Sequence, residues 1–438
     1  MMIIHLFKNP SSLSLSLLLL VGGGGGVVHY NILHASDDVK TSSHTSNHKN
    51  SNYYFSSLTM EEENQPVCID NGSGVMKAGF AGQDTPSCTF PTLVGRPKHD
   101  KLMIGGLTAN TVFVGNDADE NRGLLTLKYP INQGIVTNWK DMERIWESIY
   151  GKSNLNVSKI EQHPVLMTEV PLNPNRNREK SAEVFFETFN VPAFFISPQA
   201  TLSLYASGRT TGVVLDVGDG VTHSVPVFEG FALRHALTRS DVGGRDVTSR
   251  LQLLLRKSGS VFHTSAEFQV VRCIKESTCY VSKNVKQDEE QLSRDEKSMI
   301  QQYTLPDGRR LNLSGERFRA PELLFDPTLI GLEYRGVHKC LVDSIHKSDL
   351  DLRKTLYEHI VLAGGSTKFK GFGNRLLDES RRLAPKGTKI RITASPDRQW
   401  AAWIGGSILA SLTSFKTMWI RRDTYEEMGC SVLHRKAL

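Results

Sequence analysis

The stretch "GVVLDVGDGVTHSVPVFEG", Gly212–Gly230, decides the fold. An apolar run typical of a buried strand reaches Asp216, and a second carboxylate, Asp219, follows between two glycines. Glycine adopts backbone angles that other residues avoid, so we expect a tight hairpin here. The amide groups exposed by such a turn form a concave set of donors that suits phosphate. The stretch therefore predicts a strand, a turn that holds an anion, and a second strand.

A second stretch, "VCIDNGSGVMKAGFAG" (Val67–Gly82), repeats this pattern with Asp70 and a Gly-Ser-Gly turn. Two carboxylates would repel phosphate, but they suit Mg²⁺ that is held partly through water. A third element, "IVLAGGSTKFKGFGNRL" (Ile360–Leu376), places two glycines where a strand ends, so that the backbone can approach a sugar and base. Each element alone would more often be an ordinary tight loop. Together they predict two similar halves that hold one nucleoside triphosphate.

The rest of the chain alternates between strand and helix patterns, which favours an α/β fold with mixed sheets. We expect strands at Val67–Ile69, Val75–Phe80, His163–Thr168, Gly212–Leu215, His223–Phe228 and Ile360–Leu362. We expect helices at Trp139–Tyr150, in "NPNRNREKSAEVFFETF" and in "SDLDLRKTLYEHI", the last opened by a Ser/Asp cap. The charged segment Lys283–Arg310 should form an exposed helix or loop.

Composition places the chain among globular proteins. Its 438 residues suffice for two or three domains, and 39% are hydrophobic while 22% are charged. The six cysteines form no CxxC pair and have no zinc spacing, so we interpret them as reduced thiols. The net charge of +6 is scattered along the chain, which favours a solvated surface over binding to nucleic acid.

Residues 1–63 are interpreted as an N-terminal extension. The first part loosely resembles a signal peptide, but its apolar stretch is too short for a membrane span and is broken by five glycines. The part that follows is rich in Ser, His and Asn, which is typical of disorder. Met60 precedes three glutamates and looks like the start of a cytosolic chain. We therefore expect a disordered or mispredicted leader and a cytoplasmic protein.

Five stretches resemble actin: "IDNGSGVMKAGFAG", "YPINQGIVTNWKDMERIW", "SLYASGRTTGVVLD", "GDGVTH" and "WIGGSILASL". The similarity runs from about Pro66 to Leu438. It implies an α/β actin-like ATPase fold, in which two ribonuclease-H-like lobes surround a cleft for ATP and Mg²⁺. The first lobe would comprise 64–206, with 96–128 as an outer subdomain, and would be completed by 401–438. The second would comprise 207–400. A loop tip at Met103–Leu107 would grip the next subunit of a filament.

The resemblance also implies a role for each matching position. The catalytic residues that orient the attacking water would be Gln199 and His223. The Mg²⁺ site would be anchored by Asp70 and Asp216. The phosphates would be held by Gly72, Ser73, Gly74, Lys77, Gly218, Asp219 and Gly220. The ribose and base would be contacted by Arg272, Lys275, Glu276, Gly364, Gly365, Lys368 and Gln399. Any one of these side chains alone also fits a structural role, so their joint place in the motifs carries the prediction.

Three positions depart from the actin pattern. Val217 replaces a serine in the second hairpin, Gln133 replaces a histidine, and Ala363 replaces a serine before Gly-Gly. The valine removes a hydroxyl group near the phosphates. Since the backbone donors remain, this change bears on hydrolysis and on switching between nucleotide states more than on binding.

Within the superfamily, "EVFFETFNVPAFF", "FRAPELLFDPTLIG" and "HKSDLDLRKTL" resemble the centractin branch, the actin-related proteins of dynactin. That resemblance implies a cytoskeletal ATP-binding protein that polymerises into a short filament, with dynactin subunits, dynein and filament cappers as partners and no membrane span. Any ATPase would be slow and coupled to assembly, or absent in a nucleotide-bound scaffold. The alternative is a divergent conventional actin, favoured by "TLKYPINQGIVTNW". A sugar kinase or a heat-shock chaperone would need a further substrate pocket or a peptide-binding domain.

Overall fold

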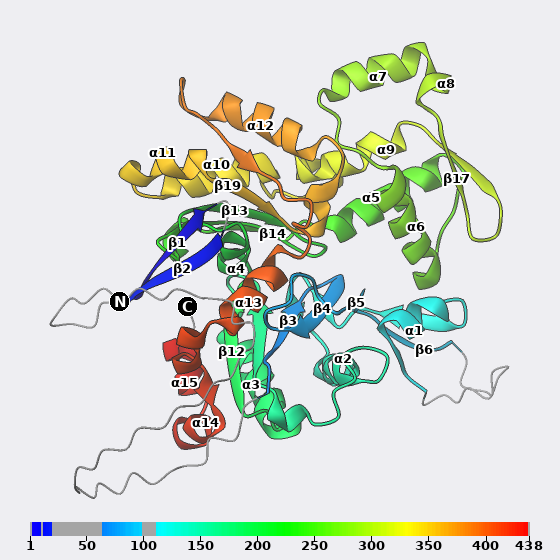
Figure 1. Ribbon diagram of the computed structural model, residues 1–438. Coiled ribbons are helices and arrows are strands. Elements are labelled where there is room, and N and C mark those ends of the chain that lie inside the picture. The colour runs from blue at the N-terminus through cyan, green and yellow to red at the C-terminus, as the bar shows by residue number, and fades with distance from the viewer. Residues whose placement is uncertain (1, 10–11, 20–63, 99–110, 437–438) are drawn as a thin grey trace, which may run out of the picture.

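The computed structural model describes residues 2–9, 12–19, 64–98 and 111–436. Two six-stranded sheets, each covered by helices, form the body of the molecule (Figure 1). The first has the order β21-β12-β11-β3-β4-β5. Its strands are β3 (Val67–Asn71), β4 (Val75–Phe80), β5 (Cys88–Pro91), β11 (Val165–Glu169), β12 (Ala193–Pro198) and β21 (Ile420–Arg421).

The second sheet has the order β15-β14-β13-β19-β20, and β16 pairs with β14. Its strands are β13 (Gly212–Val217), β14 (Thr222–Phe228), β15 (Phe231–Ala232), β16 (Thr238–Ser240), β19 (Ile360–Ala363) and β20 (Ile392–Thr393). The sheets share one plan. In each, a hairpin (β3–β4 or β13–β14) is antiparallel, and its first strand lies parallel to a later strand, β11 or β19. This is the internal similarity that the two glycine turns predicted.

Smaller sheets complete the strand content of the described residues. A three-stranded sheet joins β6 (Val94–Pro97), β7 (Phe113–Val114) and β8 (Leu125–Lys128). Three pairs are β9 (Ile131–Asn132) with β10 (Ile135–Val136), β17 (Gln301–Thr304) with β18 (Arg310–Leu313), and β1 (Met2–Asn9) with β2 (Ser12–Leu19). The rest of the predicted N-terminal extension, and the loop tip at Met103–Leu107, lie outside the described residues.

Helices cover both sheets (Figure 1). Those of the first part of the chain are α1 (Gly115–Glu120), α2 (Trp139–Tyr150), α3 (Asn175–Glu183) and α4 (Gln199–Ala206). The middle of the chain forms α5 (Gly244–Lys257), α6 (Ser265–Thr278), α7 (Val285–Arg294), α8 (Glu296–Met299) and α9 (Glu316–Arg319). The remainder forms α10 (Val337–Lys347), α11 (Leu350–Glu358), α12 (Phe372–Leu383), α13 (Ala401–Ser411), α14 (Arg422–Met428) and α15 (Ser431–Lys436).

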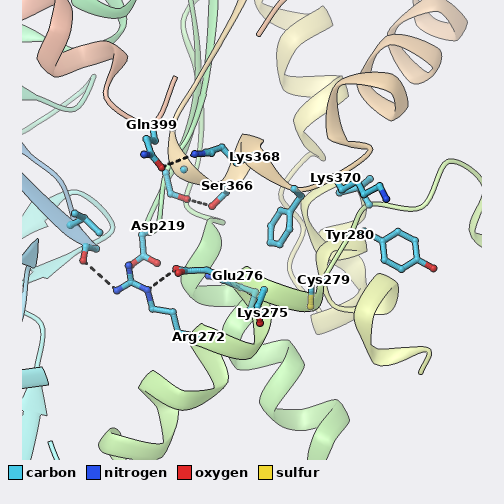
Figure 2. Close-up of a pocket in the computed structure, with 18 of the residues that line it drawn as sticks. Asp219, Arg272, Lys275, Glu276, Cys279, Tyr280, Ser366, Lys368, Lys370 and Gln399 are labelled. Carbon is cyan, nitrogen blue, oxygen red and sulfur yellow. Dashed lines mark hydrogen bonds and ion pairs between the residues drawn. The ribbon is translucent and has the colours of Figure 1, made fainter. Parts of the chain in front are cut away.

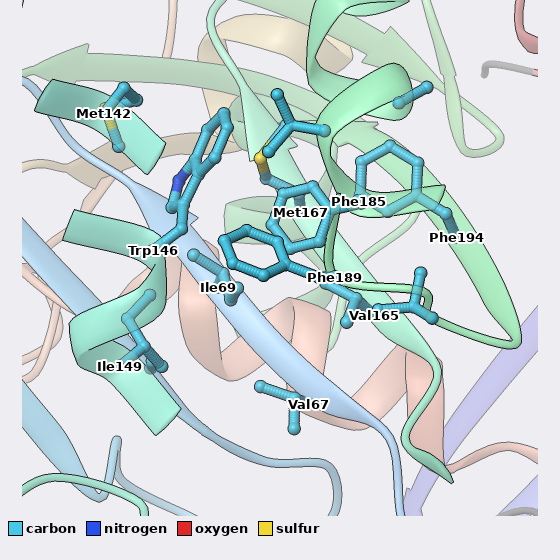
Figure 3. Close-up of a cluster of buried hydrophobic side chains, with 14 of the residues drawn as sticks. Val67, Ile69, Met142, Trp146, Ile149, Val165, Met167, Phe185, Phe189 and Phe194 are labelled. Atoms are coloured by element: carbon cyan, nitrogen blue, oxygen red, sulfur yellow. The ribbon is translucent and has the colours of Figure 1, made fainter. Parts of the chain in front are cut away.

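The core beside the first sheet combines aliphatic and aromatic side chains (Figure 3). Helix α2 begins where the Asn138 side chain accepts a hydrogen bond from the Asp141 amide, and it buries Trp146 completely. The Trp146 ring centroid lies 5.0 Å from that of Phe185, which stacks on Phe194 at 4.9 Å. Fully burying a large apolar side chain contributes about 1.5–3 kcal/mol, so this cluster holds α2 and the sheet together.

Two helical expectations change in detail. After α3 the chain widens into a π-helix at Val184–Thr188, which places the adjacent Phe185 and Phe186 both in the core. Asp349 occupies the N-cap position of α11 as expected, but its side chain makes no capping hydrogen bond. The charged segment after Lys283 forms α7, α8 and β17, and no side chain of α7 or α8 is buried.

The C-terminal segment returns to the first sheet. Trp403 of α13 is buried, and its Nε1 donates to the Cys68 carbonyl oxygen of β3 at 3.0 Å. Helices α13 and α4 touch closely at Gly405, where a Cβ atom would lie 1.8 Å from the Leu202 carbonyl oxygen. The lobe boundaries themselves stay predictions. All six cysteines are unpaired thiols, as expected.

Candidate functional site

A cavity of about 1230 Å³ opens between the two sheets. Its walls are the turns after β3 and β13, helix α6 and the turn after β19 (Figure 2). All of the site residues that the sequence predicted line this cavity, with the single exception of Asp70. Segments far apart in the chain therefore meet at one cleft, which is where α/β proteins bind ligands.

The two glycine turns touch each other across the cleft. A Cβ atom on Gly74 would lie 2.6 Å from Cβ of Asp219, and one on Gly220 would lie 3.0 Å from Ser73 Oγ. A Cβ contact under 3.0 Å forces a neighbour to move, so glycine is required at Gly74 for this approach. The glycines thus bring two sets of backbone groups to the same point, as a phosphate site needs.

Asp70 lies behind the cavity wall. Its carboxylate accepts hydrogen bonds from Lys77 Nζ at 2.5 Å, Thr168 Oγ1 at 2.6 Å and Gln199 Nε2 at 3.0 Å. Burial would raise the pKa of Asp70, but the Lys77 ammonium and these hydrogen bonds outweigh it and hold the pKa below its ordinary value. Lys77 and Gln199 line the cavity while their polar ends are bonded to Asp70.

The pKa of Asp216 shifts in the opposite direction. Burial, reinforced by the charge of Asp70, raises the pKa of the Asp216 carboxyl to about 7. His223 Nε2 lies 3.7 Å from its carboxylate oxygen. Burial, and then the charge of Arg239, lowers the pKa of His223 to about 3, so the imidazole is neutral and the two groups do not form an ion pair. Neither ring nitrogen of His223 has a hydrogen-bond partner among the described residues. A buried polar group of this kind calls for a ligand or water.

These groups fit a magnesium-bound phosphate. Carboxylate oxygens are hard ligands of the kind that Mg²⁺ prefers, and the ion usually completes its shell with waters and phosphate oxygens. Within the part of the chain that the structure describes, no cluster of three or more His, Cys, Asp or Glu side chains could hold a metal alone. Asp70 and Asp216 therefore suit an ion that arrives with a nucleotide.

Arg245 is a residue of the site that the sequence analysis missed. It lies in the first turn of α5, where its Nε donates to Asp219 Oδ2 at 3.1 Å and its Nη2 donates to the Ser73 carbonyl oxygen at 2.9 Å. Its guanidinium also lies over the Tyr129 ring at 4.2 Å. Arg245 thereby ties the second hairpin to the first. The sequence signal was the double glycine before the helix, because a Cβ atom on Gly243 would lie 2.5 Å from the Asp219 carbonyl oxygen.

Helix α6 supplies three predicted residues. Arg272 Nε donates to Glu276 Oε1 at 2.9 Å, and Arg272 Nη1 reaches the carbonyl oxygen of Gly74 at 3.5 Å (Figure 2). Lys275 is buried and donates to the Gly244 carbonyl oxygen at 2.9 Å. Burial lowers the pKa of Lys275, against the charges of neighbouring carboxylates. Arg272 thus contacts the opposite hairpin directly.

The turn after β19 forms the far wall. Gly364 has φ +86°, and a Cβ atom there would lie 2.3 Å from Asp216 Oδ1, whereas Gly365 has open space. Ser366 Oγ donates to the Gly218 carbonyl oxygen at 2.8 Å, and Lys368 Nζ donates to Gln399 Oε1 at 3.1 Å (Figure 2). The third glycine element therefore joins the same cleft, as predicted.

The departures from the actin pattern take defined places. Val217 is fully buried and packs in the hydrophobic core of the second sheet, away from the cavity. Gln133 has φ +47°, and its carbonyl oxygen accepts from Arg239 Nη2 at 2.8 Å. Ala363 is buried at the end of β19.

Comparison with known proteins gives two findings. The family model described as actin matches residues 61–438. A protein of Neurospora crassa described as "Actin-like protein" is 54% identical over 382 residues, which cover 86% of this chain and all of that relative. The first finding confirms the predicted fold class, an α/β protein with the actin-like ATPase fold. Among the described residues, no helix has the length and apolar character needed to cross a membrane.

Proposed function

This chain belongs to the actin family, and from that premise we propose that it binds ATP with Mg²⁺ in the cleft between its two sheets. Actin-family proteins generally bind ATP with a divalent metal. The observation that carries the proposal is the contact between the two glycine turns, with Asp216 and the Asp70–Lys77 pair directly beside them.

Different residues of the cleft would contact different parts of the bound Mg-ATP. The backbone of Ser73, Gly74 and Gly220 would hold the β- and γ-phosphates, and Lys77 would offset their charge. Asp70 and Asp216 would hold the waters of Mg²⁺. When bound, the ion neutralises the phosphate oxygens and so makes the terminal phosphorus easier to attack.

Hydrolysis, where it occurs, is proposed to be slow and linked to assembly. Gln199 lies beside Asp70, and the neutral imidazole of His223 lies beside Asp216 with both nitrogens unpartnered among the described residues. These two side chains would orient the attacking water, which is the main requirement of phosphoryl transfer. Val217 has no hydroxyl group, and its side chain packs in the hydrophobic core of the second sheet, so this position offers the phosphates no side-chain hydrogen bond.

Nucleotide binding is tested by calorimetric titration of the full chain with Mg-ATP. Asp216→Asn should weaken binding of Mg-ATP by roughly 10- to 100-fold, since it removes a ligand of the ion's water shell. The matched control is Asp351→Asn, an exposed aspartate in the first turn of α11 that does not line the cavity. Equal affinities for the two variants would contradict the assignment of the site.

At a finer level, we propose a filament-forming subunit of the dynactin type, which serves as a short cytoskeletal scaffold for dynein-driven transport along microtubules in the cytoplasm. Actin-family proteins self-associate into filaments, and the centractin-like stretches named above support this branch. One of them opens α11, where the Leu350 side chain is 75% exposed. Exposed leucine at an element start is available for a subunit contact, so Leu350→Asp should impair assembly.

The alternative, a divergent conventional actin that forms microfilaments, rests on the actin-like segment around Tyr129–Trp139. Electron microscopy of the full chain in Mg-ATP separates the two proposals. Short filaments with a narrow length distribution, together with recovery of dynactin subunits in pull-down experiments, support the dynactin type. Long filaments of indefinite length that myosin decorates support conventional actin.

A further inference from the structure

Thr168 is a buried polar residue beside Asp70 that the proposed roles leave unused. It lies near the end of β11, which stands between β3 and β12 in the sheet, and it is 1% exposed. Its Oγ1 donates to Asp70 Oδ1 at 2.6 Å and accepts from the Asn71 amide at 3.1 Å. Gln199 Nε2 lies 3.3 Å from the same hydroxyl oxygen. One hydroxyl group therefore joins the end of β3 to the start of α4.

These bonds distinguish the two oxygens of the Asp70 carboxylate. Each carboxylate oxygen has two lone pairs that can accept hydrogen bonds. Both lone pairs of Oδ1 are used, because Thr168 Oγ1 donates to it at 2.6 Å and Gln199 Nε2 donates to it at 3.0 Å. Oδ2 accepts from Lys77 Nζ at 2.5 Å. Among the hydrogen bonds of the described residues, the carboxylate thus keeps one acceptor position, and it is on Oδ2.

The place of Thr168 determines which carboxylate oxygen turns toward the cavity. Lys77 lines the cavity, whereas Thr168 does not. The short bond to Thr168 therefore holds Oδ1 on the side away from the cavity, and Oδ2 lies on the side of Lys77. The hydroxyl group is itself oriented, because the N–H groups of Asn71 and Gln199 both point at its oxygen and leave its proton for the carboxylate.

We propose that Thr168 is a positioning residue for Mg²⁺: its hydroxyl group holds Asp70 Oδ1 away from the ligand and keeps Oδ2 as the oxygen that accepts from a water of the ion. The inference rests on the proposed function, since it takes the Mg-ATP site from it. Side chains that orient the ligands of a metal typically change its affinity by roughly 10- to 100-fold. Thr168 acts through Asp70 and not by touching the nucleotide.

The test is calorimetric titration of the full chain with ATP, once with Mg²⁺ and once with EDTA in its place. The ratio of the two dissociation constants measures what the ion adds to ATP binding. Thr168→Val keeps the shape of the side chain but has no hydroxyl group, so it should reduce that ratio by roughly tenfold. Thr168→Ser keeps the hydroxyl group and should retain the parent ratio. Thr168→Cys carries a weak donor and should lie between them, so it provides the test if Thr168→Val does not fold.

Two controls separate positioning from a structural role. Thr238→Val removes a hydroxyl group that donates to the Cys340 carbonyl oxygen outside the cavity, so it should leave the ratio unchanged. In an Asp70→Asn background, Thr168→Val should lower the ratio no further, because the effects of two residues that act as a unit are not additive.

Three results would overturn the inference. The first is a Thr168→Val protein with the parent ratio, and the second is an equal loss of ATP affinity with Mg²⁺ and with EDTA, which indicates a structural role alone. The third is a full effect of Thr168→Val in the Asp70→Asn background. If the parent protein binds no ATP, or binds it equally with and without Mg²⁺, the proposed function fails and this inference fails with it. Mg²⁺-dependent binding by the parent, with an unchanged ratio for Thr168→Val, refutes the inference alone.

Discussion

Arg245→Ala tests whether the contact between the two halves stabilises the fold. In the parent, Arg245 donates to the Asp219 carboxylate and to the carbonyl oxygens of Ser73 and Ile131, and it covers the Tyr129 ring. A hydrogen bond to a charged group contributes about 1.5–3 kcal/mol when partly buried, and neutral acceptors contribute less. The Arg245 and Asp219 side chains are only 21% and 20% exposed, so water replaces these bonds poorly.

We therefore expect Arg245→Ala to lower the free energy of unfolding by about 3 kcal/mol, measured by urea denaturation of the nucleotide-free protein and followed by circular dichroism. It should also weaken Mg-ATP binding, because Asp219 then places an unneutralised carboxylate beside the phosphates. Arg245→Lys should give a free energy of unfolding between those of the parent protein and Arg245→Ala, because one ammonium group cannot reach all of the acceptors that the guanidinium group reaches.

The matched control is Arg294→Ala, which removes an exposed pair with Glu290 on α7. Pairs of that kind contribute less than about 1 kcal/mol, so its unfolding curve should overlay that of the parent protein. The reasoning is refuted if Arg245→Ala unfolds at the same urea concentration as Arg294→Ala.

Three further predictions concern single positions. Gly405→Ala should lower the melting temperature strongly, because its Cβ would lie 1.8 Å from the Leu202 carbonyl oxygen, whereas Gly373→Ala in α12 has open space and should be neutral or stabilising. Because the pKa of Asp216 is raised to about 7, its carboxyl destabilises the nucleotide-free fold increasingly as pH rises from the ordinary range through 7. Affinity for Mg-ATP should accordingly fall between pH 8 and pH 6, and Asp216→Asn should flatten both dependences. Val217→Ser should cost about 1–3 kcal/mol of unfolding free energy without faster phosphate release, since the side chain faces the core; a faster release in a phosphate assay would contradict the packing.

The sequence predicts those parts of the candidate site whose residues belong to a recognisable local pattern. Aspartates at strand ends next to glycine turns marked Asp70 and Asp216, and the helical spacing of apolar residues marked α2 with its observed bounds. The match to the actin family confirms the fold that these motifs indicated. The observed strand ends differ from the predicted ones by one or two residues. Pairing with neighbouring strands, and not local preference, decides where a strand stops.

The sequence by itself determined the repeated strand–turn–strand unit, because the apolar pattern of the strands, the turn glycines and the aspartates at the strand ends are all local features of the chain. Only the tertiary structure decided what those turns contact. The double glycine before Arg245 signals a close approach of the backbone, but no local pattern shows that Arg245 joins Asp219 to Ser73 across the cleft. Tertiary packing likewise bonded Lys77 to Asp70 and turned Val217 into the core. Hydrogen bonds and ion pairs between distant segments depend on how the two sheets are placed relative to each other. A pattern within one segment of the sequence carries no information about that placement.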